Sequence, residues 1–185
     1  MADPITFNFV DTSRRRFLRS AAAGALCCAA GPVLASYNDR RSVAFVHTHT
    51  GEHLDAVYFR DGAYDQTTLL QVAYTFRDFR CGDVHTIDPM LLDALFELRM
   101  RADHDKPYQI ISAYRSPKTN AALRKTSHAV AEHSMHIEGR AIDIRVAGVS
   151  TKKLRDLALA MGRGGVGYYP DSDFLHVDTG RIRSW

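Results

Sequence analysis

Residues 134–143 read SMHIEGRAID and join His136 to Asp143 through a turn at Gly139. From Ala141 to Val146 apolar and polar residues alternate, which predicts a strand with Asp143 on its polar face. An ionised carboxylate beside an apolar strand face needs a partner, and a metal ion is a good one. This stretch therefore holds the first two candidate metal ligands, His136 and Asp143.

A second stretch, residues 174–178, reads FLHVD and places His176 and Asp178 on one strand face. Together with His136 and Asp143, His176 would complete two imidazoles and one carboxylate, the usual catalytic zinc set with one open position. Such a site lowers the pKa of a bound water to about 7 from about 16. The chain holds nine histidines, so spacing alone also allows a structural pair of histidine and aspartate.

Around these stretches, turn residues and hydrophobic periodicity predict a mixture of strands and helices. The expected strands are 41–49, 56–60, 108–113, 141–146, 166–169 and 174–178, and the expected helices are 66–78, 89 onward, 116–125 and 151–161, the last capped by Ser150. This order predicts the α+β class, as a single compact domain with a central, mainly antiparallel sheet flanked by helices.

Composition excludes several classes of protein. The 185 residues are 45% hydrophobic and 24% charged, which excludes a disordered or collagenous chain. The net charge of +3 suggests a nucleic-acid partner, but four of the 24 Lys and Arg residues lie in residues 1–35, with two of the 21 acidic ones. Residues 36–185 therefore carry 20 basic and 19 acidic residues, and we expect no nucleic-acid partner.

Residues 1–35 predict a secretory signal peptide. Ser13-Arg14-Arg15-Arg16-Phe17-Leu18-Arg19 resembles the twin-arginine signal, and an Ala-rich apolar run follows it to Ala35. We expect cleavage near Ala35–Ser36, a mature domain of residues 36–185, a periplasmic location and no stable membrane span after cleavage. Because Cys81 is the one cysteine left in that domain, it forms no internal disulfide.

The spacing Ser-x-His-x-x-Gly-x-Ala-x-Asp, followed by a strand histidine, resembles the LAS metallopeptidases of the lysostaphin, D-Ala-D-Ala carboxypeptidase and Hedgehog types. Three further stretches are similar to the YcbK/MepK murein endopeptidases: ISAYRSP at 111–117, GGVGYYP at 164–170 and FLHVDTG at 174–180. The resemblance extends from about Arg41 to the closing Trp185, and it implies the LAS-type fold.

The resemblance implies one Zn²⁺ per chain, held by His136, Asp143 and His176. Arg115 matches an arginine beside the zinc and would stabilise an oxyanion or hold a substrate carboxylate, with a structural role in its loop as the alternative. Ser134 matches the serine of the motif, where it would contact the substrate or simply form a turn.

The general base has two candidates. Asp173 lies three residues before His176, where many relatives carry an acidic residue, and we favour it. Asp178 is the alternative, and its other role is to orient a zinc ligand. His133 lies outside the motif positions, and a place along the cleft is open to it without a role as ligand.

The function implied by the resemblance is an exported, zinc-dependent peptidoglycan endopeptidase that cleaves cross-links involving meso-diaminopimelate. A D,D-carboxypeptidase or dipeptidase is the nearest alternative enzyme. A non-catalytic, zinc-containing cell-wall-binding domain is the alternative of another class. The sequence leaves open which cross-link is preferred and whether a regulatory lipoprotein takes part.

Overall fold

A computed structural model describes residues 40–126 and 130–185, so the predicted signal peptide lies outside the described residues. Strands and helices alternate irregularly along these residues. The strands are β1 (Arg40–His47), β2 (His53–Arg60), β3 (Ala63–Tyr64), β4 (Tyr108–Ser112), β5 (Ala141–Val146), β6 (Gly165–Tyr169), β7 (Phe174–Asp178) and β8 (Arg183–Ser184). The helices are α3 (Gln66–Thr75), α4 (Pro89–Ala102), α5 (Pro117–Thr126) and α6 (Thr151–Met161).

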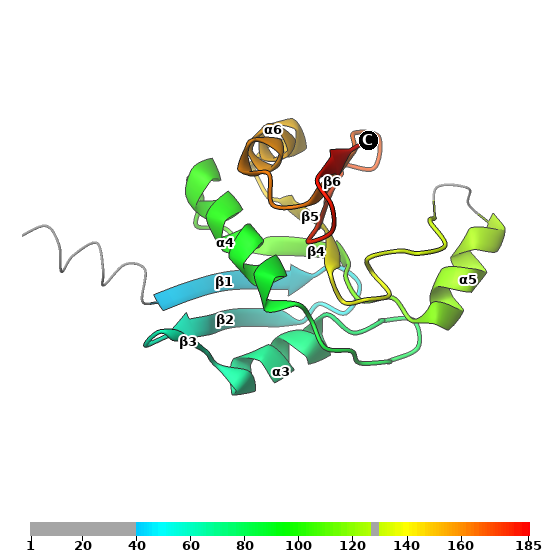
Figure 1. Ribbon diagram of the computed structural model, residues 1–185, viewed down its shortest axis with the longest axis horizontal. Coiled ribbons are helices and arrows are strands. Elements are labelled where there is room, and N and C mark those ends of the chain that lie inside the picture. Colours follow the sequence, from blue (N-terminus) through cyan, green and yellow to red (C-terminus); the bar gives the residue numbers. More distant parts are fainter. Residues whose placement is uncertain (1–39, 127–129) are drawn as a thin grey trace, which may run out of the picture. The chain divides into compact units, whose positions relative to one another are not determined.

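The eight strands form one sheet in the order β3-β2-β1-β4-β5-β7-β6-β8. In Figure 1, β3, β2, β1 and β4 follow one another across this sheet. Most neighbouring strands are antiparallel, whereas β1 pairs with β4 and β6 pairs with β8 in parallel. The prediction of an α+β domain with a mainly antiparallel sheet is therefore confirmed.

Two helices begin where capping residues predict it. The side chain of Asp65 accepts a hydrogen bond from the Thr68 N–H at the start of α3, and Asp88 does the same for Met90 at the start of α4. The expected cap of α6 is only partly right, because Ser150 occupies the position without a side-chain hydrogen bond. The left-handed conformation of Gly162 ends that helix.

The two faces of the sheet have different roles. Helices α3, α4 and α6 bury their apolar side chains in the same core as the strands, where Ile142, Ile144, Leu175 and Val177 are at most 4% exposed. Because side chains alternate along a strand, the residues between these four point to the opposite face. The candidate site lies on that face of β5 and β7.

In residues 40–126 and 130–185, no helix has the length and apolarity that a bilayer crossing requires.

Candidate metal centre

Neighbouring strands bring the two parts of the sequence motif together. Strands β5 and β7 are antiparallel partners, and Asp143 lies directly opposite His176 in their register. His136 comes from the turn that precedes β5, and its carbonyl accepts a hydrogen bond from the Arg115 N–H at 3.1 Å. All three side chains are buried, with exposed fractions of 3–7%.

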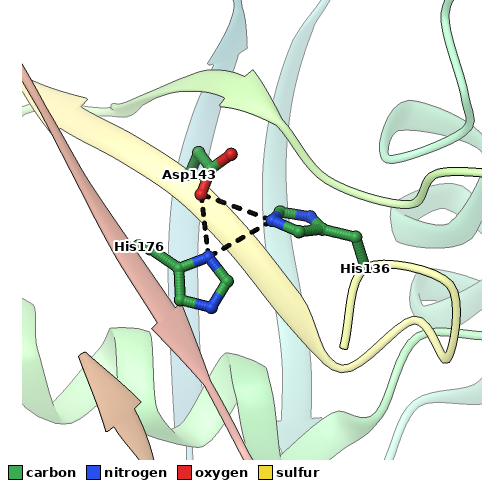
Figure 2. A group of neighbouring side chains, drawn as sticks. All are labelled: His136, Asp143 and His176. Atoms are coloured by element: carbon green, nitrogen blue, oxygen red, sulfur yellow. Dashed lines mark hydrogen bonds and ion pairs between the residues drawn. The ribbon is translucent and has the colours of Figure 1, made fainter. Parts of the chain in front are cut away.

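The three side chains point toward one another (Figure 2). His176 Nδ1 lies 2.9 Å from Asp143 Oδ1 and 3.2 Å from His136 Nε2. His136 Nε2 lies 3.4 Å from the same carboxylate oxygen. Among residues 40–126 and 130–185, this is the one group of His, Cys, Asp or Glu side chains arranged to hold a metal ion.

Hydrogen bonds on the far side of each imidazole fix its tautomer. His136 Nδ1 lies 2.6 Å from the Ala113 carbonyl, which can only accept, so this nitrogen carries the proton. His176 Nε2 lies 3.0 Å from the Asp178 carboxylate and carries a proton for the same reason. In the neutral imidazoles, His136 Nε2 and His176 Nδ1 therefore present lone pairs toward the carboxylate of Asp143.

The electrostatics of the group favour a positive charge at its centre. Burial alone would raise the pKa of Asp143, but the adjacent His136 and His176 lower it well below its usual range. Burial would lower the pKa of His176, yet hydrogen bonds to Asp143 and Asp178 and their charges raise it instead. The buried carboxylates of Asp143 and Asp178 thus flank the imidazole of His176, and their negative charge favours a cation at this position.

These properties match the requirements of a zinc site. Two neutral imidazole nitrogens and one carboxylate oxygen converge, and each imidazole is oriented by an acceptor behind it, as is usual for ligating histidines. A cavity of about 400 Å³ borders all three residues, which leaves one side of the group open. The donor set therefore fits Zn²⁺ with a free coordination position.

The same cavity is lined by a buried guanidinium. Arg115 is only 9% exposed, and its one side-chain hydrogen bond in the described residues goes from Nη1 to Asn120 Oδ1 at 3.3 Å. Its Nε is buried without a partner among these residues, and burial lowers the pKa of the group. An arginine buried without a carboxylate partner is suited to an anionic or carbonyl ligand.

Comparison with known proteins agrees with this geometry. Residues 35–185 match the family Peptidase_M15_2, described as "Peptidoglycan L,D-endopeptidase MepK". The chain belongs to the MepK family. The resemblance to the YcbK/MepK murein endopeptidases is therefore confirmed, and membership of a peptidase family confirms the enzyme class.

Two relatives show how far the similarity extends. "Peptidoglycan L,D-endopeptidase MepK" of Escherichia coli K12 is 42% identical over 145 residues, which cover 78% of this chain and 80% of that protein. "Probable peptidoglycan L,D-endopeptidase MepK" of Haemophilus influenzae is 36% identical over 182 residues, or 96% of this chain and 98% of that protein. No solved structure matches the chain.

The two candidates for the general base, Asp173 and Asp178, lie outside the lining of the cavity that borders the candidate metal ligands. Asp173 is exposed, adopts a positive φ of 49° before β7, and accepts a hydrogen bond from Thr151 Oγ1 at 3.0 Å. Asp178 is fully buried, and both of its oxygens accept hydrogen bonds. Neither carboxylate lines the cavity.

Two other residues singled out in the sequence do line the cavity. Ser134 is buried, and its Oγ accepts a hydrogen bond from the His136 N–H at 3.3 Å, so the hydroxyl also shapes the turn that carries His136. His133 lines the cavity with an exposed imidazole. Ser134 thus shapes the turn that carries His136, and both Ser134 and His133 line the cavity that borders the candidate ligands.

The sequence did not reveal two cavity residues from the C-terminus. Arg183 and Trp185 line the cavity, and Arg183 also forms an ion pair with Asp178 at 2.6 Å. No spacing rule connects them to residues 134–143. Only the pairing of β8 with β6 brings them to the site.

Proposed function

We propose that this chain is an exported, zinc-dependent peptidoglycan endopeptidase that hydrolyses peptide cross-links. The observation that carries the proposal is the convergence of His136 Nε2, Asp143 Oδ1 and His176 Nδ1 beside the buried guanidinium of Arg115. Membership of the MepK family and the endopeptidase activity for which its relatives are named support the choice of peptidoglycan as substrate.

His136, Asp143 and His176 would hold the metal. When bound, Zn²⁺ supplies a Lewis acid that polarises a carbonyl and makes water a nucleophile near neutral pH. The chain orients both imidazoles for this role: the Ala113 carbonyl accepts a hydrogen bond from His136 Nδ1–H, and the Asp178 carboxylate accepts one from His176 Nε2–H. The ligands therefore need little rearrangement to bind a cation.

Arg115 would bind the substrate at the reacting centre. Its guanidinium is held in the cavity wall by Asn120 and by the backbone contact between Arg115 and His136. A fixed donor of this kind stabilises negative charge that develops on a carbonyl oxygen, or fixes the carboxylate of a stem peptide. Ser134 lies on the same cavity and is a further candidate for contact with the peptide.

Proton transfer requires a group on the cavity wall. The sequence predicts Asp173 for this role, and the carboxylate of Asp173 accepts a hydrogen bond from Thr151 outside the cavity lining. His133 lines the cavity, and histidine is the residue type that gains and loses a proton most readily near neutral pH. We therefore assign to His133 the transfer of a proton from water to the leaving amine.

Digestion of purified sacculi tests the proposal. The zinc-loaded mature protein should release soluble muropeptides that mass analysis identifies as products of cross-link cleavage, and a chelator should abolish their release. His136→Ala should lose zinc and activity together, because one of three ligands is missing. Arg124→Ala, a change to an exposed ion pair outside the cavity, is the matched control.

The products also separate the alternatives. Loss of single terminal residues or dipeptides from uncross-linked stems, with cross-links intact, would indicate a carboxypeptidase or dipeptidase. Binding of zinc-containing protein to sacculi without any cleavage would favour a non-catalytic wall-binding domain and would overturn the proposal.

Export is a separate part of the proposal. Arg14 and Arg15 precede an apolar run that ends near Ala35, a pattern that supports transport by the twin-arginine route. Replacing both arginines with lysine should retain the protein in the cytoplasm. Unchanged processing and periplasmic recovery of that variant would contradict this route.

A further inference from the structure

The C-terminal residue of the chain is part of the cleft. Trp185 lines the cavity and is 50% exposed, and the centroid of its ring lies 5.1 Å from that of His176. A half-exposed indole that borders a cavity is an apolar surface available to a ligand.

Several contacts hold Trp185 in place. Its backbone N–H donates to the Val166 carbonyl at 3.3 Å, and its carbonyl accepts from the Tyr168 N–H at 3.0 Å. The indole Nε1–H donates to the Tyr169 hydroxyl at 2.8 Å. The last residue is thus fixed through both its backbone and its ring.

The strand beneath the indole leaves room for the ring. Gly167 lies opposite His176 in the register of β6 and β7. A Cβ atom at this glycine would come within 2.6 Å of the indole of Trp185. Residue 167 therefore has to be glycine for the indole to occupy this position beside His176.

Two more aromatic rings continue the surface. Tyr169 and Phe174 stack with their centroids 4.4 Å apart, and both line the cavity. We call Tyr169, Phe174 and Trp185 the aromatic wall. Polar groups line other parts of the same cavity, among them Arg115 and His133.

We propose that the aromatic wall binds the methylene chain of the diamino acid at the scissile bond, and that Trp185 is a specificity-determining residue. This inference rests on the proposed function. Since an extended residue spans about 3.4 Å, a ring 5.1 Å from that of His176 faces a residue at or next to the bond being cleaved. An indole buries a large apolar area on such a chain while its N–H stays hydrogen-bonded.

Kinetics of the zinc-loaded enzyme on cross-linked muropeptides test the inference. Trp185→Ala should raise KM by about tenfold, the effect of losing one good aromatic contact, and leave kcat within about threefold because the ligands and Arg115 are unchanged. Zinc content should stay the same, and Trp185→Phe should recover part of the KM. Tyr74→Ala removes an exposed aromatic ring outside this cavity and should change nothing.

Two outcomes would overturn the inference. An unchanged KM in Trp185→Ala means that the ring does not contact the substrate. Loss of zinc together with kcat, also in Trp185→Phe, means that the ring only supports His176.

Failure of the proposed function is distinguishable from failure of this inference. Trp185 is the one tryptophan in the chain, so the intrinsic fluorescence of wild-type protein reports on the cleft even without turnover. If wild-type protein does not cleave muropeptides, a saturable change in emission during titration with the same muropeptides still supports the aromatic wall. No change in emission in that titration overturns it.

Discussion

Asp178 shows how one buried carboxylate organises the site at the scale of a single residue. It accepts hydrogen bonds from His176 Nε2 and from the N–H groups of Gly165 and Gly180, at 2.8–3.0 Å, and forms an ion pair with Arg183. Burial would raise the pKa of Asp178, but these donors and charges lower it well below its usual range. The residue therefore stays ionised and positions His176.

Asp178→Asn should weaken zinc binding by about 10- to 100-fold, the usual effect of losing the partner behind a ligating histidine. Every group around this carboxylate is a donor, so the amide NH₂ of asparagine faces another donor in either orientation. Competition with a fluorescent zinc chelator measures the change. Asp173→Asn is the matched control, and equal zinc affinity in the two variants would contradict the positioning role.

His133 and Asp173 allow a direct comparison of two candidates for proton transfer. Because only His133 lines the cavity, His133→Asn should lower kcat by about 100-fold or more, the usual contribution of general acid–base catalysis. Asp173→Asn should keep kcat within about threefold. Both variants should retain zinc. The reverse order of the two effects would restore Asp173 as the general base.

At the scale of elements, hydrogen bonds to the segment that follows α3 hold the loop between β4 and α5 in place. Asp78 is fully buried, and its Oδ2 accepts hydrogen bonds from the N–H and Oγ–H of Ser116 at 3.0 and 2.9 Å. The neighbouring Tyr114 N–H donates to the Phe76 carbonyl at 2.9 Å. These contacts fix the backbone on both sides of Arg115, so the segment that follows α3 helps to position this residue.

Asp78→Asn should lower the free energy of unfolding by about 1–3 kcal/mol at pH 7, because a buried charged acceptor is lost. Burial alone would raise the pKa of Asp78, but hydrogen bonds from Thr119, Ser116 and the Arg80 N–H lower it. Its stabilising effect is therefore present above about pH 4, the unfolded pKa, and is lost as the pH falls further.

Urea unfolding of both proteins at pH 7 and pH 3 measures this effect. The difference in the free energy of unfolding between wild type and Asp78→Asn should be smaller at pH 3 than at pH 7. Asp55→Asn, at an exposed strand position, should change stability by less than about 0.5 kcal/mol. If the two proteins differ in the free energy of unfolding by the same amount at both values of pH, ionisation of Asp78 does not contribute to stability.

For the whole molecule, the candidate ligands come from segments that only folding brings together. His136, Asp143 and His176 lie on a turn and two strands, so the unfolded chain has no preformed site. Zinc at 100 times its Kd should therefore stabilise the fold by about 2.7 kcal/mol. For a domain of this size, this corresponds to a rise in Tm of about 5–10 °C.

Thermal unfolding with and without added zinc measures this rise. His136→Ala should remove it. A rise of the same size in that variant would show that zinc binds elsewhere on the protein.

Local patterns predicted much of the fold and part of the site. Asp88 followed by Pro89 correctly predicted the start of α4, and the alternation from Ala141 to Val146 correctly predicted β5. Side-chain alternation also placed Asp143 and His176 on the polar faces of their strands. These predictions succeeded because each depends on a few neighbouring residues.

Local patterns could not predict which way the carboxylate of Asp173 points. Its spacing from His176 suggested that both face the same centre. The positive φ at this residue lies in the turn before β7, where strand alternation does not apply, and the Thr151 hydroxyl of α6 donates a hydrogen bond to the carboxylate of Asp173. Long-range contacts of this kind leave no trace in local spacing.

The types of side chain available, the strand faces that carry them and the family of the chain all follow from the sequence alone. Which strands are neighbours becomes known only in the folded protein. That order places Asp143 opposite His176, brings Arg183 to Asp178 and sets Trp185 above Gly167. The physical reason is that strand alternation is a local property of the backbone, whereas strand order follows from how the whole chain buries its apolar surface.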